Sequence, residues 1–325
     1  MKRGLPFPPV ELKPNSSVFG MKIALWAVLL VWALEAALSA SWFWSATGTV
    51  LLGLMFAHGV ELQHQALHNS GFRSRRLNEF AGVVLGIPML VSFAGYQASH
   101  LRHHKYLGTD KNREFFDYGD QYGQGGLSAA WHAILRFSML SHYRTFACGV
   151  ARAIAGRSYP GETQYVSRRM RRDHLLMLAG ILALGVASYL MSEQLLIRGW
   201  LIPLTVVAAP VHALIELPEH FRCETDSTDT FRNTRTIRSN AFLTWFTNGN
   251  NLHVEHHLLP RLPIEELTEL HRRVAPQIKY LCPTYIAFFL DILGWKRISS
   301  EPAKISSEPA NVNEHAEPRT TLILS

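Results

Sequence analysis

Two long stretches of this chain are almost free of positive charge, and they limit the folds that it can adopt. Residues 23–62 contain neither Lys nor Arg, and residues 174–217 contain only Arg198. A helix needs about 20 apolar residues to cross the roughly 30 Å hydrocarbon core of a bilayer, so each stretch is long enough for two passes. The sequence therefore predicts an all-α integral membrane protein with four transmembrane helices arranged in two hairpins.

The boundaries of these helices are expected where charged and turn-forming residues interrupt the apolar sequence. We expect the spanning helices at residues 21–38, 42–62, 175–195 and 200–217. They would belong to a single membrane domain over residues 21–297. Residues 1–20 would form a cytoplasmic N-terminal segment, and the polar tail of residues 298–325 is predicted to be disordered.

The distribution of Lys and Arg predicts the orientation of the chain in the membrane. Basic residues are concentrated in residues 71–172 and before the first helix, whereas the short connections within each hairpin carry almost none. The positive-inside rule then places both termini and the central segment in the cytoplasm. Because this topology accounts for the formal net charge of +7, the charge does not indicate nucleic-acid binding.

Histidines recur at helical spacing in three places. One pair, His64 and His68, has a spacing of four residues, and two triplets share the pattern His-x-x-His-His. The triplets are His100, His103 and His104, then His253, His256 and His257. Residues at i, i+3 and i+4 share one face of a helix, so each triplet is predicted to converge on a point beside its helix. Together these imidazoles exceed what one four- to six-coordinate metal can use, which predicts a two-metal centre on a helical cytoplasmic cap.

An apolar segment at residues 80–99 is also long enough to be taken for a spanning helix. If it crossed the bilayer, His100 would emerge on the opposite side from His68, and the clusters could not share a centre. We therefore predict a re-entrant or buried segment, with a break permitted by Gly86, Pro88 and Gly95, since irregular backbone at membrane depth is tolerated only when protein buries it.

Further ionisable residues near the helix ends could complete the centre. His212, Glu216 and His220 follow one another at four-residue intervals, within about 80° on a helix. His220 would emerge on the same side as His64, with Glu216 as a direct or water-mediated neighbour. Glu61 precedes His64 by three residues, so its carboxylate could orient an imidazole N–H.

The remaining histidines lack ligand spacing and are interpreted as ordinary residues. His315 lies in the polar tail, where we expect it to be solvated. We expect the others to be hydrogen-bonded core residues, and they are His58, His132, His142, His174 and His271.

The order HxxxH, HxxHH and HxxHH, together with two apolar hairpins and the segments PEHF and FRNTRTIRSN, resembles the membrane fatty acid desaturase family. The resemblance covers about residues 45–265. It implies two iron ions that activate O2 as co-substrate and remove two hydrogens from an acyl chain. The ligands implied by the resemblance are His64, His68, His100, His103, His104, His220, His253, His256 and His257.

The resemblance implies a membrane-bound oxidoreductase that desaturates a fatty acyl or lipid-like substrate. The sequence has no HPGG haem motif, so reducing equivalents are expected from a separate ferredoxin or cytochrome. Gln65 replaces the acidic residue that many members have after the first histidine, and His253 replaces the Gln of the front-end branch.

One alternative function is a hydroxylase or ketolase with the same centre, acting on a lipid, a carotenoid or a small secondary metabolite. A second is a non-catalytic membrane protein that binds or transports metal.

Overall fold

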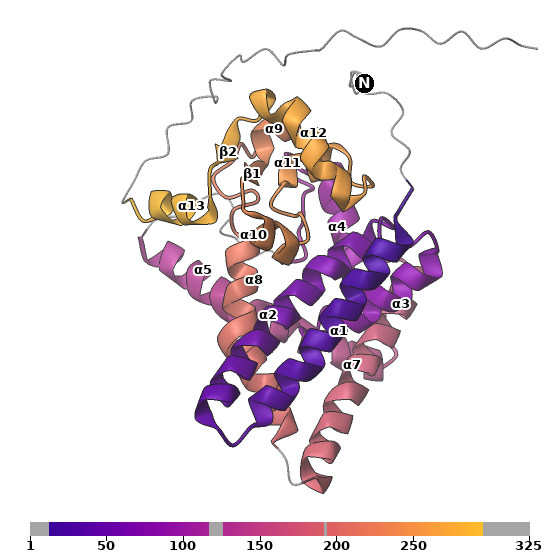
Figure 1. The fold of residues 1–325 in the computed structure, drawn as a ribbon. Coiled ribbons are helices and arrows are strands. Elements are labelled where there is room, and N and C mark those ends of the chain that lie inside the picture. The colour runs from indigo at the N-terminus through magenta and orange to yellow at the C-terminus, as the bar shows by residue number, and fades with distance from the viewer. Residues whose placement is uncertain (1–12, 117–125, 192–193, 295–325) are drawn as a thin grey trace, which may run out of the picture.

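The computed structural model describes residues 13–116, 126–191 and 194–294, and these are predominantly helical (Figure 1). Long apolar helices form one end of the molecule, and a cap of short helices with a two-stranded sheet covers the other end. The tail predicted to be disordered, residues 298–325, lies outside the described residues, as do residues 1–12 of the expected N-terminal segment.

Four helices are long and apolar enough to cross a membrane, as the charge pattern predicts. They are α1 (Ser16–Leu38), α2 (Trp42–Leu67), α7 (Gln164–Leu190) and the run Ile197–Glu216, which comprises η1 (Ile197–Leu201), η2 (Pro203–Ala208) and α8 (Ala209–Glu216). Large apolar side chains such as Val28 on α1 and Leu182 on α7 remain exposed. Such surfaces are expected where a helix faces lipid.

Two of these helices extend well beyond the boundaries expected from charge. Helix α2 continues to Leu67 instead of ending near residue 62, so His64 lies within its last turn. Helix α7 begins at Gln164, where the Thr163 side chain accepts a hydrogen bond from the Val166 N–H and caps the first turn. Charged residues mark the edge of the apolar sequence, whereas the hydrogen-bonded helix continues past that edge.

The first hairpin is held by close contact between α1 and α2. Gly48 of α2 lies against the backbone of α1, and the Trp26 indole N–H donates to the Met55 carbonyl over 2.7 Å. The second predicted hairpin packs differently. The run Ile197–Glu216 lies mainly against α2, while α7 packs against α4 (Phe93–Tyr106) and α6 (Leu140–Ile154).

The apolar segment at residues 80–99 is broken. Helix α3 (Arg75–Gly86) ends at a turn, and α4 starts at Phe93. The Gln63 amide on α2 donates to the carbonyls of Gly82 and Val91, over 2.8 and 3.1 Å. On the other side of the break, the buried Asp173 carboxylate accepts hydrogen bonds from the Ser92 hydroxyl and the Ala94 N–H. Side chains of α2 and α7 thus satisfy backbone groups that the break exposes.

The cap consists of short elements that follow Glu216. These are α9 (Thr230–Asn233), β1 (Arg235–Ile237), α10 (Ala241–Phe246), α11 (His253–Leu258), η3 (Ile264–Glu266), α12 (Leu267–Val274), η4 (Ala275–Gln277), β2 (Tyr280–Cys282) and α13 (Tyr285–Ile292). The strands pair in parallel, with Arg235 opposite Tyr280 and Ile237 opposite Cys282. Helix α5 (Gly126–Ser138) packs beside α8, below the cap (Figure 1).

Candidate metal centre

Nine histidines from four parts of the chain meet where the cap joins the long helices. Helix α2 and the residue after it provide His64 and His68, and the turn after α8 provides His220. Helices α4 and α11 each provide one complete triplet. Eight of the nine are buried, and His104 is partly buried. The break between α3 and α4 is what returns the α4 triplet to the end of α2.

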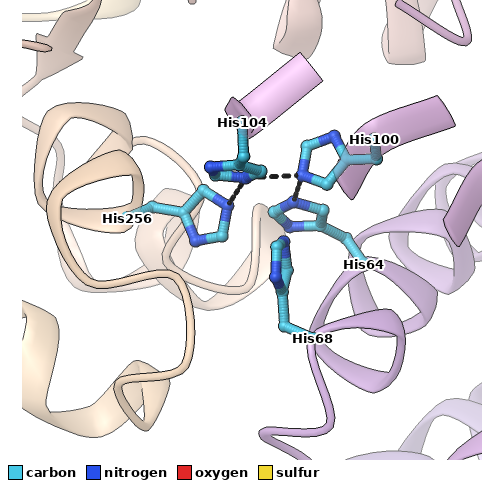
Figure 2. A group of neighbouring side chains, drawn as sticks. All are labelled: His64, His68, His100, His104 and His256. Atoms are coloured by element: carbon cyan, nitrogen blue, oxygen red, sulfur yellow. Dashed lines mark hydrogen bonds between the residues drawn. The ribbon is translucent and has the colours of Figure 1, made fainter. Parts of the chain in front are cut away.

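The first group of imidazoles contains members of three helical segments. Figure 2 shows its side chains directed toward one another, and their candidate ligand atoms all lie within 4.8 Å. The Nε2 atom of His100 is 2.8 Å from the Nε2 atom of His64 and 2.9 Å from that of His104. The Nε2 atom of His104 is in turn 3.0 Å from that of His256. The members of the first group are His64, His68, His100, His104 and His256.

A second group lies beside the first. The Nε2 atom of His257 is 3.4 Å from that of His103 and 3.2 Å from that of His253. His253 is in turn 3.3 Å from His220, again between Nε2 atoms. These four imidazoles and the Glu219 carboxylate, which is 3.3 Å from His253, make up two overlapping sets of close ligand atoms, and together we call them the second group. The sets are His103, His220 and His257, then Glu219, His220 and His253.

The expectation that each triplet converges on one point is wrong. His100 and His104 belong to the first group and His103 to the second. In α11 the division is reversed, because His256 enters the first group and its neighbour His257 the second. Consecutive residues differ by about 100° around a helix, whereas residues four apart differ by only about 40°. The imidazoles of each triplet therefore point in two directions, and α4 and α11 each contribute to both groups.

Hydrogen bonds at the outer ring nitrogens fix how these imidazoles face the centre. The His220 Nδ1–H donates to the Asn233 carbonyl over 2.9 Å, and His253 Nδ1 bonds to the Asn250 side-chain oxygen over 2.9 Å. A neutral imidazole has one N–H, so the Nε2 atoms of His220 and His253 direct lone pairs at each other. Burial keeps them neutral, since it lowers the pKa of His220 to about 4 and that of His253 well below its usual value.

This arrangement fits metal ions. Lone pairs that face each other at 3.3 Å repel unless a cation lies between them. Nitrogens about 2.1 Å from one ion and about 90–110° apart are separated by about 3.0–3.4 Å. Four of the Nε2 separations, 3.0 to 3.4 Å, lie within that range, and the other two, 2.8 and 2.9 Å, are slightly shorter. In addition, neither ring nitrogen of the buried His68 has a hydrogen-bond partner among the described residues.

The two carboxylates named from sequence, Glu61 and Glu216, lie close to the centre. Glu61 is buried and hydrogen-bonds to Asn250, which also bonds to His253. A carboxylate oxygen of Glu216 is 3.5 Å from His212, and Glu216 lines a cavity of about 30 Å³ beside both groups. That volume is enough for a water-sized molecule.

Two further carboxylates, Glu114 and Glu219, also line this cavity, and neither is among the residues predicted from the sequence. The Glu114 carboxylate is 3.0 Å from His103 Nδ1 and 3.6 Å from His220 Nε2. Glu219 directly precedes His220, so its position was a usable signal. Nothing in the sequence marks Glu114, because it follows α4 in an irregular segment and reaches the histidines only through the fold.

Two of the histidines without ligand spacing are buried and hydrogen-bonded, as predicted. His58 bonds to Phe246 over 2.7 Å, and His142 bonds to Met89 over 3.0 Å. His132 is half-buried rather than in the core, and its Nδ1–H donates to the Ser128 carbonyl of its own helix. His271 is different, since its partner is the Glu255 carboxylate within α11.

Comparison with known proteins agrees with this site. Residues 40–289 match the fatty acid desaturase family. An acyl-lipid (9-3)-desaturase of Physcomitrium patens is 24% identical over an alignment of 305 residues that covers 87% of this chain and 55% of the relative. The sphingolipid delta(4)-desaturase DES1 of Xenopus tropicalis is 37% identical over 76 residues, and a DES1-like protein of Oryza sativa subsp. japonica is 33% identical over 95 residues.

The chain spans about half the length of the first relative, and the matches to the other two cover 23% and 28% of theirs. The family match is far more extensive, since it includes all nine clustered histidines and three of the four long apolar helices, whereas α1 ends just before it. The chain therefore belongs to the fatty acid desaturase family, whose members are oxidoreductases.

Proposed function

We propose that this protein is an O2-dependent di-iron desaturase that introduces a double bond into a fatty acyl or lipid-like substrate. The observation that carries the proposal is the convergence of nine largely buried imidazoles in two adjacent groups. Imidazole alone also suits zinc, copper and nickel, so the choice of iron rests on family membership. Electrons would come from a separate donor protein of the ferredoxin or cytochrome type.

We assign one iron to each group. His64, His68, His100, His104 and His256 would hold the first, and His103, His220, His253 and His257 the second. When bound, the two irons supply the one-electron redox chemistry that amino-acid side chains lack for breaking an unactivated C–H bond. The outer hydrogen bonds to Asn233 and Asn250 orient the imidazoles, and burial keeps them unprotonated.

Four buried or partly buried carboxylates lie near the second group and would balance its charge: Glu61, Glu114, Glu216 and Glu219. Burial alone would raise the pKa of Glu114, but the hydrogen bond from His103 and the positive charge of Arg136 help to lower it to about 2. Burial raises the pKa of Glu219 well above its usual value, and the neighbouring carboxylates of Glu216 and Glu61 raise it further. A cation at this position would stabilise the ionised form of both carboxylates.

Replacing Glu114 by Gln tests this role for the carboxylate. The change keeps the shape and removes the charge beside His103, so we expect iron to bind the second group about 10–100-fold more weakly. The measurement is the iron remaining after titration with a chelator. Glu266→Gln, an exposed residue of η3, is the control and should retain iron like the native protein. Equal iron retention in both variants would show that Glu114 does not support the centre.

Linked cavities offer a route for an acyl chain. The cavity beside the histidines shares Glu114, Phe115 and Phe116 with a second cavity of about 220 Å³. The second shares Phe115, His142 and Thr145 with a third, of about 150 Å³, between α6 and α7. An acyl chain lying along these three cavities would reach the metal centre with one end, while its other end stays near the surface of α6.

The sidedness of the site follows from charge. We place both termini and the cap in the cytoplasm, because the basic residues near the long helices lie at the end of the molecule that bears the cap. Residues 21–297 would form one domain, since the centre needs helices from both halves of the chain. A cytoplasmic centre is accessible to a soluble donor and lies at the level where a membrane lipid can enter.

Iron content and product mass together test the proposed function. Detergent-purified protein should contain about two irons per chain by elemental analysis. Lipids from expressing cells should include a product lighter by two hydrogen atoms, found by mass spectrometry. A product heavier by one oxygen atom would instead favour the hydroxylase or ketolase alternative. Reproducible absence of both iron and product would favour a metal-binding or transport protein.

A further inference from the structure

A basic cavity opens on the cap, away from the linked cavities that lead to the histidines. It has a volume of about 560 Å³ and lies between β1, α10 and α12. Arg238, His271 and Arg272 supply its ionisable groups, and the described residues that line it include no carboxylate. Arg238 and Arg272 are both exposed. Because α12 lies on the side of the cap opposite the long helices, a water-soluble protein can reach it (Figure 1).

A short chain of contacts connects this cavity to the metal-binding helix. His271 lines the cavity, and its Nδ1 is 2.5 Å from a carboxylate oxygen of Glu255. Glu255 is fully buried within α11, next to His256. Its other oxygen accepts a hydrogen bond from the Thr236 hydroxyl over 2.7 Å, and that hydroxyl accepts from the Val254 N–H. One side-chain contact therefore links the cavity to the helix that bears three clustered histidines.

The charge of the cavity selects among partners. Arg272 forms an ion pair with Glu269, and Arg273 shares that same carboxylate, so that among these three α12 residues positive charge exceeds negative charge. Adjacent Arg238 has no ion pair among the described residues. Positive surfaces steer and bind acidic proteins, and the attraction weakens as salt increases.

We propose that this cavity is the docking site for an acidic, soluble one-electron carrier protein, and that electrons pass through His271 and Glu255 to α11. The proposal rests on the proposed function, which needs an external reductant. For each double bond, O2 receives four electrons and four protons and yields two water molecules. Two electrons and two protons come from the two broken C–H bonds. Two successive carrier oxidations provide the other two electrons, and solvent provides the other two protons.

Binding of an acidic [2Fe–2S] ferredoxin to the detergent-purified, iron-loaded protein tests the docking site. Combined Arg238→Glu and Arg272→Glu should raise the Kd at least about tenfold and remove most of its salt dependence. The matched control reverses two exposed charges on α3, Arg75→Glu with Arg76→Glu, and should bind like the native protein. An unchanged Kd in the cavity variant, or an equal increase in both variants, would overturn the proposal.

The electron path is tested separately with His271→Gln, which keeps a hydrogen-bond donor for Glu255. We expect an unchanged ferredoxin Kd and iron content, but at least about tenfold slower oxidation of pre-reduced ferredoxin in stopped-flow absorbance. An unchanged oxidation rate would exclude His271 from the path.

Failure of the docking site and failure of the proposed function are distinguishable. Iron and product obtained with dithionite as reductant, but without cavity-dependent ferredoxin binding, would reject the docking site alone. Absence of iron and product under the same conditions would reject the proposed function. Acidic cytochrome b5 serves as a second carrier, and a native protein that binds neither carrier would also overturn the docking proposal.

Discussion

His256→Ala is expected to abolish turnover and to release iron from the first group. The His256 Nε2 atom is 3.0 Å from that of His104, and its ring lies 4.5 and 4.6 Å from those of His64 and His68, between centroids. Removing one proposed ligand should reduce activity at least about 100-fold, because loss of an outer partner alone costs about 10–100-fold. Product formation and iron per chain are the two measurements.

His132→Ala is the matched control for this substitution. His132 is half-buried on α5, and among the residues that the structure describes its ring bonds to Ser128 of the same helix. We expect native activity and iron content. Both variants should insert into membranes in native amounts, so that a loss of activity in His256→Ala reports the centre. If His256→Ala retained activity and iron, the assignment of the first group would be rejected.

Gly48→Val is expected to prevent correct packing of α1 against α2. A Cβ atom at Gly48 would lie 2.2 Å from the Ala37 nitrogen and 2.6 Å from the Ala33 carbonyl oxygen. Both are backbone atoms of α1, so relief requires the two helices to separate. Small residues allow such close approach in membranes, where packing is a main source of helix association. We expect destabilisation of about 3 kcal/mol or more, near the upper range for overpacking.

The yield of monodisperse protein after detergent extraction, with its thermal unfolding midpoint, measures this effect. Gly180→Val is the matched control, because Gly180 also lies within a spanning helix and an added Cβ meets nothing within 4 Å. This control should give a native yield. Equal yields from both variants would contradict the close packing at Gly48.

Local sequence predicted the long helices well and their ends poorly. The absence of charge in residues 23–62 and 174–217 marked four helices long enough to cross a bilayer. It did not indicate that α2 continues to Leu67 or that α7 begins at Gln164. Apolar sequence reflects the solvent around a helix, whereas the helix itself ends where hydrogen bonding and capping end.

The sequence also could not identify all the groups near the centre. His220 was recognisable from its spacing to Glu216, and the structure places it in the second group. Glu114 was not recognisable, because its proximity to His103 depends on the path of the chain after α4. His271 was interpreted as an ordinary core residue, but it joins a cap cavity to Glu255.

By itself, the sequence determined that this protein has four apolar helices and three histidine clusters at ligand spacing, because hydrophobicity and helical periodicity are local properties. Only the tertiary structure decided how the histidines are shared. It assigns His103 and His104, which are adjacent in sequence, to different groups, and it separates His256 from His257 in the same way. The physical reason is that a helix fixes the angle between neighbouring side chains, whereas the packing of α2, α4 and α11 decides what each angle faces.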